Sequence, residues 1–233
     1  MPAREAKALL FDLDGTLVDS IDDLVVAINQ TLGEINARPL TRDEVTTFIG
    51  KGARNMVERS LRAVLLTAPQ EDEVESCYRA YVQNMNALDA KYSKLLPYVH
   101  ESLSSLKAAG FRMAVVTNKP SVVIPSLLER FELKDFFDVV LGADSVVHPK
   151  PAPDMLHLAC ERLGVKPSEA FMIGDSMNDA LAAQNAKIQA LLLKTGYNEG
   201  IKIEDWVIIN TPNFPVFDTM RELTQYLLLP KRS

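Results

Sequence analysis

The octapeptide Phe11-Asp12-Leu13-Asp14-Gly15-Thr16-Leu17-Val18 indicates the fold more clearly than any other part of the chain. It continues a short, uninterrupted apolar run at residues 8–11, which is typical of a buried strand in a parallel sheet. Open α/β sheets bind ligands beyond the carboxyl ends of their strands, where Asp12 and Asp14 fall. Two adjacent carboxylates repel each other unless a cation lies between them or one keeps a proton. The stretch therefore indicates a metal site with a carboxylate nucleophile and a second acid, although Asp and Gly also form ordinary turns.

Composition limits the class of protein and its partners. The chain has 233 residues, which is enough for one domain or one domain with an insertion. Its net charge of -6 gives no broad electrostatic case for binding nucleic acid or an anionic membrane. No apolar run approaches the length of a membrane span, and no signal-peptide core fits before Asp12. We expect a cytoplasmic protein, a monomer or homodimer, whose partner is a small molecule.

The cysteines and histidines indicate no metal or disulfide chemistry. Cys77 and Cys160 are isolated within helix-like patterns, so we expect two buried thiols and no disulfide. His100, His148 and His157 are scattered without the spacing of metal ligands, which argues against a zinc site.

The segment after the first strand is predicted to be helical, with no strand for roughly seventy residues. Apolar residues at helical spacing begin at Ile21, and Thr41-x-x-Glu44 is a capping box that opens a second helix. Gly50-Lys51-Gly52 interrupts the pattern before a helix to about Ala63, and a longer helix follows Pro69. We expect a helical cap domain at residues 18–90, inserted into a core formed by residues 1–17 and 91–233.

Helices and strands alternate in the rest of the chain. The predicted strands are 111–116, 138–141, 171–173, 189–193 and 207–209. The predicted helices are 98–109, 120–131, 153–163, 176–186 and 217–228. This alternation predicts an α/β fold, a doubly wound, Rossmann-like parallel sheet with helices on both faces.

Polar side chains follow two of the predicted strands. Thr117 and Asn118 precede a helix, where a hydroxyl and backbone N–H groups make either an anion site or an ordinary N-cap. Lys150 lies in a stiff loop between Pro149 and Pro151, so it is either a phosphate-neutralising cation or a solvated lysine.

A further strand ends in Gly174-Asp175, and Asp179 follows one helical turn later. The two carboxylates can face the same ion, Asp179 through a water, although Ser176 and Asp179 also fit a capping box. The strand ends together offer four carboxylates, one Lys and one Thr. A phosphoryl group needs that set of a nucleophile, an acid, a divalent ion and a balancing cation.

These residues carry a resemblance to a known family. Four motifs resemble, in order, those of the haloacid dehalogenase superfamily of aspartyl-phosphate phosphatases: Asp12-x-Asp14-Gly15-Thr16, Thr117-Asn118, Lys150-Pro151 and Gly174-Asp175-x-x-x-Asp179. The segment 18–90 resembles the family's first type of cap. Three further stretches are most similar to the phosphoglycolate phosphatases: Leu17-Val18-Asp19-Ser20, Thr117-Asn118-Lys119-Pro120 and Gly196-Tyr197-Asn198-x-Gly200.

The chain departs from this pattern at Asn185-Ala186-Lys187-Ile188, where relatives usually have Ala-Gly. A glycine there would provide the left-handed cap of the preceding helix, so its loss predicts a strained or reshaped turn.

The resemblance implies a role for each motif. Asp12 would attack phosphorus, and Asp14 would protonate the leaving alkoxide and then deprotonate water, its protonated form favoured by the like charge beside it. Mg²⁺ would be held by Asp12, Asp175 and the carbonyl oxygen of Asp14. The phosphoryl oxygens would be held by Thr117, the Asn118 N–H and Lys150, while Gly15 lets the backbone approach closely. The cap would close to exclude water and select the leaving group.

The cap also suggests the substrate. Gly50 and Gly52 allow a tight turn over the phosphate site, and Lys51 or Arg54 would offer a cation to a second anionic group, unless both are solvated surface charges. The carboxylate of 2-phosphoglycolate would use such a cation, and the resemblance at Asn118-Lys119-Pro120 and Gly196-Tyr197-Asn198 implies this substrate. The alternatives are a phosphomutase resembling β-phosphoglucomutase, a pyrophosphatase and a non-catalytic binding module, which would be expected to have lost a motif residue. A dehalogenase is disfavoured because it needs no metal and lacks an acid like Asp14.

Overall fold

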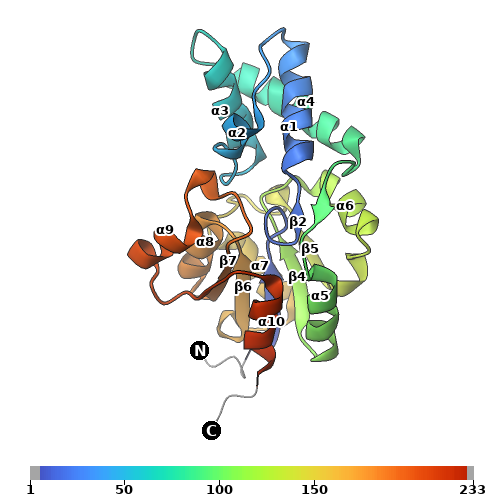
Figure 1. Ribbon diagram of the computed structural model, residues 1–233, viewed down its shortest axis with the longest axis vertical. Coiled ribbons are helices and arrows are strands. Elements are labelled where there is room, and N and C mark those ends of the chain that lie inside the picture. The colour runs from blue at the N-terminus through green and yellow to red at the C-terminus, as the bar shows by residue number, and fades with distance from the viewer. Residues whose placement is uncertain (1–5, 230–233) are drawn as a thin grey trace.

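The structure, a computed structural model, describes residues 6–229 and has two lobes. A small lobe of helices lies above a larger lobe that holds the sheet (Figure 1). We call the small lobe, which contains the four helices between residues 21 and 88, the cap, and the larger lobe the core. The predicted division of the chain at residues 18 and 90 stays a prediction. Residues 1–5 and 230–233 of the predicted core lie outside the described residues.

Six parallel strands form the sheet of the core in the order β5-β4-β1-β6-β7-β8. They are β1 (Ala8–Phe11), β4 (Arg112–Val116), β5 (Val139–Leu141), β6 (Ala170–Gly174), β7 (Gln189–Leu193) and β8 (Val216–Phe217). The chain builds outward from β1 to β5 on one side and then from β6 to β8 on the other. The strand order therefore reverses between β1 and β6, which is where open α/β sheets form ligand sites.

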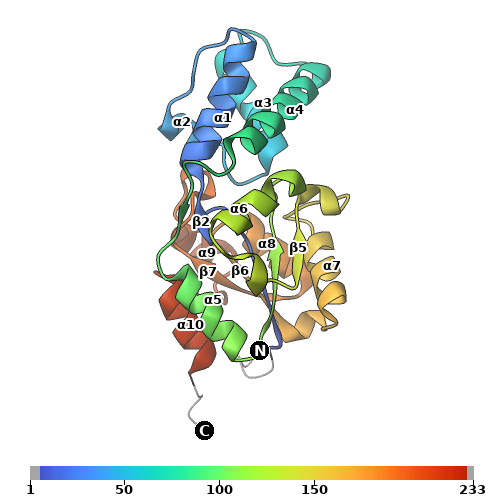
Figure 2. The same ribbon diagram turned by 90° about the vertical axis from the view of Figure 1, so that its right-hand side faces the viewer.

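Helices cover both faces of the sheet, which confirms the doubly wound fold (Figure 2). Side chains of α5 (Val99–Ala108), α6 (Ile124–Arg130) and α10 (Met220–Leu228) pack with Leu9 and Phe11 of β1 on one face. Those of α7 (Asp154–Leu163), α8 (Met177–Ala186) and α9 (Ile203–Asn210) pack with Ala8 and Leu10 on the other face. Because successive strand residues point to opposite faces, the uninterrupted apolar run of β1 serves both layers.

The cap has a hydrophobic core of its own. Its helices are α1 (Ile21–Glu34), α2 (Arg42–Thr46), α3 (Ala53–Val64) and α4 (Glu71–Leu88), and their apolar faces meet in one buried cluster. The predicted capping box of Thr41 and Glu44 opens α2. The chain passes between the lobes at β2 (Val18–Asp19) and β3 (Lys94–Leu95), which pair antiparallel. The prediction of a strand-free segment is therefore wrong at β2.

The largest disagreement with the predicted elements is near the C-terminus. Residues 207–209 are not a strand but lie in α9, and the last strand of the sheet is β8. Ile203 and Val207, four residues apart, pack under the sheet, whereas Ile208 and Ile209 are 71% and 82% exposed. Burial at helical spacing, not the short apolar run, determines this element. The last helix begins at Met220 rather than at residue 217.

Two smaller predictions have clear outcomes. Lys187 adopts a left-handed conformation at the end of α8, with φ 58°, and its N–H still bonds to the carbonyl of Ala183. The turn therefore keeps the shape that a glycine would give it, at the steric cost of a side chain there.

Cys77 and Cys160 are buried free thiols, as predicted, and burial raises the pKa of Cys160 to about 11.

Candidate active site

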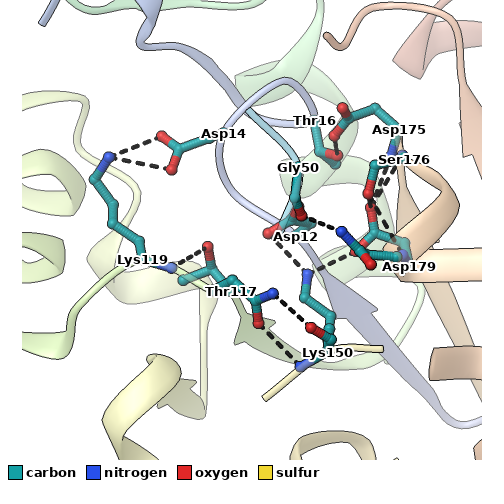
Figure 3. A network of polar contacts seen from close by, with 12 residues as sticks. Asp12, Asp14, Thr16, Gly50, Thr117, Lys119, Lys150, Asp175, Ser176 and Asp179 are labelled. Carbon is teal, nitrogen blue, oxygen red and sulfur yellow. Dashed lines mark hydrogen bonds and ion pairs between the residues drawn. The ribbon is translucent and has the colours of Figure 1, made fainter. Parts of the chain in front are cut away.

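A cavity of about 70 Å³ lies between the cap and the carboxyl ends of the strands. The core contributes Asp12, Asp14, Thr117 and Asp175 to its wall, and the cap contributes mainly apolar side chains, among them Met56, Tyr81 and Met85. The cavity therefore has a charged floor and an apolar ceiling. Figure 3 shows the charged side of this arrangement.

Asp12 leaves the end of the central strand β1. Its N–H still bonds to the carbonyl of Ile173 on β6 at 2.8 Å, so the neighbouring strands fix its position. Its carboxylate Oδ1 lies 3.0 Å from the Nζ of Lys150. Burial raises the pKa of Asp12 to about 7, with Asp179 and Asp14 adding to the rise and Lys150 opposing it.

Lys150 is an internal cation rather than a solvated loop lysine, because its side chain is only 2% exposed. Its Nζ donates to Asp179 Oδ1 at 2.6 Å and also faces Asp12. Burial alone would lower the pKa of Lys150, but Asp12 and Asp179 together raise it above its ordinary value. The ammonium therefore remains charged where a phosphoryl oxygen would need it.

Asn118 holds the loop that carries Lys150. Its Nδ2 donates to the carbonyl of Lys150 at 2.7 Å, and its Oδ1 accepts from the N–H of Lys150 at 3.0 Å. Thr117, beside it, lines the cavity with its side chain buried and its hydroxyl accepting from the N–H of Lys119 at 3.2 Å. Two segments 32 residues apart are thus joined at the floor of the site.

Three carboxylates are grouped closely enough to hold a metal ion. Asp12, Asp175 and Asp179 each offer an oxygen, and these atoms lie within 4.8 Å of one another. Burial, then Asp179 and Asp12, raise the pKa of Asp175 well above its ordinary value. A divalent cation would relieve this repulsion, and oxygen ligands alone suit a hard ion such as Mg²⁺. The donor set therefore fits the predicted magnesium site.

Asp175 and Asp179 are not equivalent within that group. Asp179 forms the capping box with Ser176 that the sequence also allowed, since its Oδ2 accepts from the N–H of Ser176 at 3.1 Å. Its other oxygen accepts from Lys150, and the side chain has no exposed surface. Asp175 has one side-chain donor, the Thr16 hydroxyl at 2.6 Å, and lines the cavity. Asp175 is thus the better placed to meet an ion directly.

Gly15 is required by close packing at this point. Its φ is +86°, and a Cβ there would lie 2.6 Å from Asp175 Oδ2. Any larger residue would therefore displace a carboxylate of the metal group.

Asp14 has partners that the sequence reasoning missed. Lys119 Nζ lies 3.0 and 3.1 Å from its two oxygens, and Ser20 Oγ donates to it at 2.5 Å. The Lys119 side chain is 3% exposed, so this ion pair lies inside the protein. The only signal was local: Lys119 follows Thr117-Asn118 and Ser20 follows Asp19, inside stretches quoted for the resemblance but not assigned a role.

The predicted cap residues occupy different positions. Gly50 and Gly52 line the cavity, whereas the side chains of Lys51 and Arg54 do not. Lys51 Nζ lies 3.3 Å from Glu199 Oε1, and Arg54 pairs with Glu71 on the surface of the cap. The structure thus brings five predicted core residues to one cavity, namely Asp12, Asp14, Thr117, Asn118 and Asp175. The Lys150 ammonium contacts Asp12 and Asp179 next to that lining, whereas Lys51 and Arg54 pair with Glu199 and Glu71 outside it.

The chain is similar to known hydrolases in both sequence and fold. The haloacid dehalogenase-like hydrolase family matches residues 9–193. A phosphoglycolate phosphatase of Colwellia psychrerythraea is 38% identical over 228 residues, covering 96% of this chain and 97% of that protein. A crystal structure of a predicted phosphoglycolate phosphatase from Haemophilus somnus is 32% identical with a TM-score of 0.86, covering 95% of this chain and 97% of the other.

A third similar structure contains bound phosphate. CbbY from Rhodobacter sphaeroides, crystallised in complex with phosphate, is 26% identical with a TM-score of 0.79, covering 94% of this chain and 96% of the other.

Across residues 6–229 of the present chain, no helix combines the length and apolar character needed to cross a membrane.

Proposed function

The chain belongs to the haloacid dehalogenase-like hydrolases, and we propose that it is a Mg²⁺-dependent phosphatase that hydrolyses 2-phosphoglycolate through an aspartyl phosphate. The observation that carries the proposal is the buried Lys150 ammonium, which lies within 3.0 Å of both Asp12 and Asp179 beside Asp175. This arrangement supplies a nucleophile, a metal site and a balancing cation in one place. We further propose that the protein acts in the cytoplasm, as a monomer or homodimer.

Asp12 is the proposed nucleophile. Its carboxylate oxygen forms a bond to phosphorus while the bond from phosphorus to the leaving oxygen breaks, which gives an acyl phosphate. Lys150, Thr117 and the Asn118 N–H hold the phosphoryl oxygens during this step, and Asn118 keeps Lys150 in place through its backbone.

Asp12 and Asp175 would hold Mg²⁺ together with the carbonyl oxygen of Asp14, and Asp179 would act through a water. When bound, the ion neutralises the carboxylates and the phosphoryl oxygens that face them. Asp179 keeps Lys150 oriented in either case, because the ion pair between them is buried.

Asp14 is the proposed acid and base. It gives a proton to the leaving alkoxide and later takes one from the water that attacks the acyl phosphate, which releases phosphate and frees Asp12. Ser20 and Lys119 contact its carboxylate and restrict its orientation, so the proton is delivered to a fixed place.

The substrate assignment rests on the relatives and on the size of the cavity. Relatives that cover nearly the whole chain are phosphoglycolate phosphatases, and a cavity of about 70 Å³ suits a small ester. Lys51 or Arg54 is the proposed partner of the substrate carboxylate. The apolar ceiling formed by Met56, Tyr81 and Met85 would exclude bulk water from the reacting groups while the acyl phosphate forms.

A panel of phosphate esters tests the proposal. The purified protein is assayed with Mg²⁺ on 2-phosphoglycolate, glucose 1-phosphate isomers, pyrophosphate and a sugar bisphosphate, and kcat/KM is compared. We expect 2-phosphoglycolate to rank first and EDTA to abolish turnover until Mg²⁺ is added back. Isomerisation of a sugar phosphate without phosphate release would indicate a phosphomutase, and preference for pyrophosphate would indicate a pyrophosphatase. Absence of turnover on every compound would contradict an enzymatic role.

A further inference from the structure

Residues 194–202 form a loop that the proposed mechanism does not use. We call this segment, which runs from the end of β7 to the start of α9, the 194–202 loop. It contains the stretch Gly196-Tyr197-Asn198-Glu199-Gly200, which resembles the phosphoglycolate phosphatases but has no role in the mechanism above. The loop contacts three parts of the site: the carboxylate group, the start of the cap and the turn that leads into α3.

The base of the loop is fixed to the active site. A Cβ on Gly196 would lie 1.6 Å from Asp175 Oδ2, so the backbone of the loop rests directly on that carboxylate. The Thr195 hydroxyl donates to the carbonyl of Gly15 at 2.6 Å. The Oδ1 of Asn198 accepts from the N–H of Met177 at 2.7 Å. The loop therefore cannot shift without disturbing Asp175 and its neighbours.

Tyr197 fixes the place where the chain enters the cap. Its hydroxyl donates to Asp19 Oδ1 at 2.5 Å and accepts from the N–H of Ile21 at 3.2 Å. Asp19 belongs to β2, and Ile21 is the first residue of α1. Burial and Asp19 raise the pKa of Tyr197, which keeps its hydroxyl a donor.

Glu199 contacts the cap with both its backbone and its side chain. Its N–H donates to the carbonyl of Ile49 at 3.2 Å. Its carboxylate lies 3.0 Å from Arg59 Nη1 and 3.3 Å from Lys51 Nζ, and its side chain is 11% exposed. Arg59 is held in the cap, since its guanidinium lies 5.0 Å from the centre of the Phe48 ring.

A second core residue contacts the same part of the cap. The side-chain amide of Asn178, on α8, donates to the carbonyl of Gly50. Ile49 and Gly50 line the cavity, so both contacts reach the segment of the cap nearest to the reacting groups. The cap is thus held at its loop as well as at its entry strand.

We propose that Glu199 is a positioning residue that keeps the cap loop, residues 49–52, over the active site through its ion pair with Arg59. The pair joins the two lobes, and neutralising Arg59 would leave the nearly buried Glu199 carboxylate with Lys51, at 3.3 Å, as its charged partner. Loss of the pair should shift the cap toward positions in which the cavity is open, so that less of the protein is ready to bind substrate. The kinetic part of this inference rests on the proposed phosphatase function, whereas the position of the cap does not.

A double-mutant cycle tests the proposal. We expect Glu199→Gln and Arg59→Gln each to raise KM for 2-phosphoglycolate by about five- to tenfold, with a smaller change in kcat. The double variant should be no worse than Glu199→Gln alone, because Glu199→Gln already removes the ion pair with Arg59. Effects that multiply in the double variant would overturn the proposal.

Arg38→Gln is the matched control. It makes the same chemical change in an ion pair of the cap, Arg38 with Glu44 at 2.9 Å, that does not reach the core. We expect its kinetics to match the unmodified protein. An equal rise of KM in Arg38→Gln would show that any lost charge on the cap has this effect, and would also overturn the proposal.

Hydrogen exchange gives a readout that needs no activity. Amides of residues 49–52 should exchange faster in Glu199→Gln and Arg59→Gln than in the unmodified protein. Their exchange rates in Arg38→Gln should equal those of the unmodified protein. If the unmodified protein hydrolyses none of the esters, the proposed function fails, but the exchange result still decides the role of Glu199. Unchanged exchange at residues 49–52 in both variants would contradict that role.

Discussion

The Nζ of Lys150 lies 3.0 Å from the Oδ1 of Asp12, at the end of the central strand. Burial favours the protonated carboxyl of Asp12, whereas Lys150 favours the ionised one, and the pKa of Asp12 is raised to about 7 in the metal-free protein. A cation bound among the carboxylates would add to the effect of Lys150 and favour the ionised form that can attack phosphorus. A metal bound at this group would therefore be coupled through charge to the proposed reactivity of Asp12.

The first prediction concerns the nucleophile. Asp12→Asn should abolish turnover, because an amide oxygen cannot form the acyl phosphate. The variant should also accumulate no covalently bound phosphate that hydroxylamine releases. The measurement is quenched-flow labelling with a radioactive ester, with circular dichroism to verify the fold. Substantial turnover by a folded Asp12→Asn variant would exclude the covalent mechanism.

The second prediction concerns the acid and base. Asp14→Asn keeps the backbone carbonyl proposed for the metal but cannot transfer a proton, so kcat for an alkyl phosphate should fall about 10²–10⁴-fold. An aryl phosphate with a good leaving group should lose less in the first step, because its departure needs no proton. The ratio of the two losses is the measurement. Equal and small losses would assign the proton transfer to another residue.

The third prediction links pH, metal and stability. Asp12 and Asp175 have raised pKa values, so the metal-free folded protein holds protons more tightly than the unfolded chain does. Their contribution to stability is present at low pH and is lost as the pH rises from about 4 through about 7. Saturating Mg²⁺ binds the ionised carboxylates, so the increase in Tm that it gives should grow over the same pH window.

Asp175→Asn is the control for that prediction. Removing one buried carboxylate relieves repulsion, so the metal-free variant should lose less stability between low and neutral pH than the unmodified protein. It should also gain little from Mg²⁺, because a proposed ligand is missing. Thermal unfolding with Mg²⁺ or EDTA across the pH range measures both. An increase in Tm from Mg²⁺ that is independent of pH would contradict the assignment.

The sequence was most informative about positions at the ends of strands. The parallel order of β1, β4 and β6 brings Asp12, Thr117 and Asp175 to one edge, and that follows from any doubly wound sheet. The strand predicted at 207–209 failed because a run of three apolar residues fits a strand or a buried helix equally well.

Contacts between distant segments lay beyond such reasoning. The Asn118 amide bonds to the backbone of Lys150, and Lys119 pairs with Asp14 across 105 residues of sequence. Neither partner has a periodic pattern, because each contact depends on where two loops meet after the sheet has formed. The pairing of Glu199 with Arg59 is of the same kind, since it joins two lobes whose relative placement no local pattern encodes.

The last prediction concerns recognition of the substrate carboxylate by the cap. Lys51 lies between Gly50 and Gly52, which line the cavity, and its ammonium pairs with Glu199 at 3.3 Å. Arg54 pairs with Glu71 on the cap surface, so its guanidinium would have to leave that carboxylate to meet the substrate. If a cap cation reads the carboxylate of 2-phosphoglycolate, Lys51→Ala should lower kcat/KM for this ester about tenfold or more, since losing a charged partner in a closed polar site costs about 2–5 kcal/mol.

The neutral ester 4-nitrophenyl phosphate separates this role from positioning of the cap. Lys51→Ala should change kcat/KM for 4-nitrophenyl phosphate only slightly, because this ester has no carboxylate for Lys51 to bind. Arg54→Ala, measured on both esters, shows whether the second cation has the same role; a selective loss there and none in Lys51→Ala would transfer the assignment to Arg54. An equal loss on both esters would mean that Lys51 acts by holding the loop against Glu199. No loss in either variant would remove the cap cations from substrate recognition, and the case for 2-phosphoglycolate would then rest on the relatives alone.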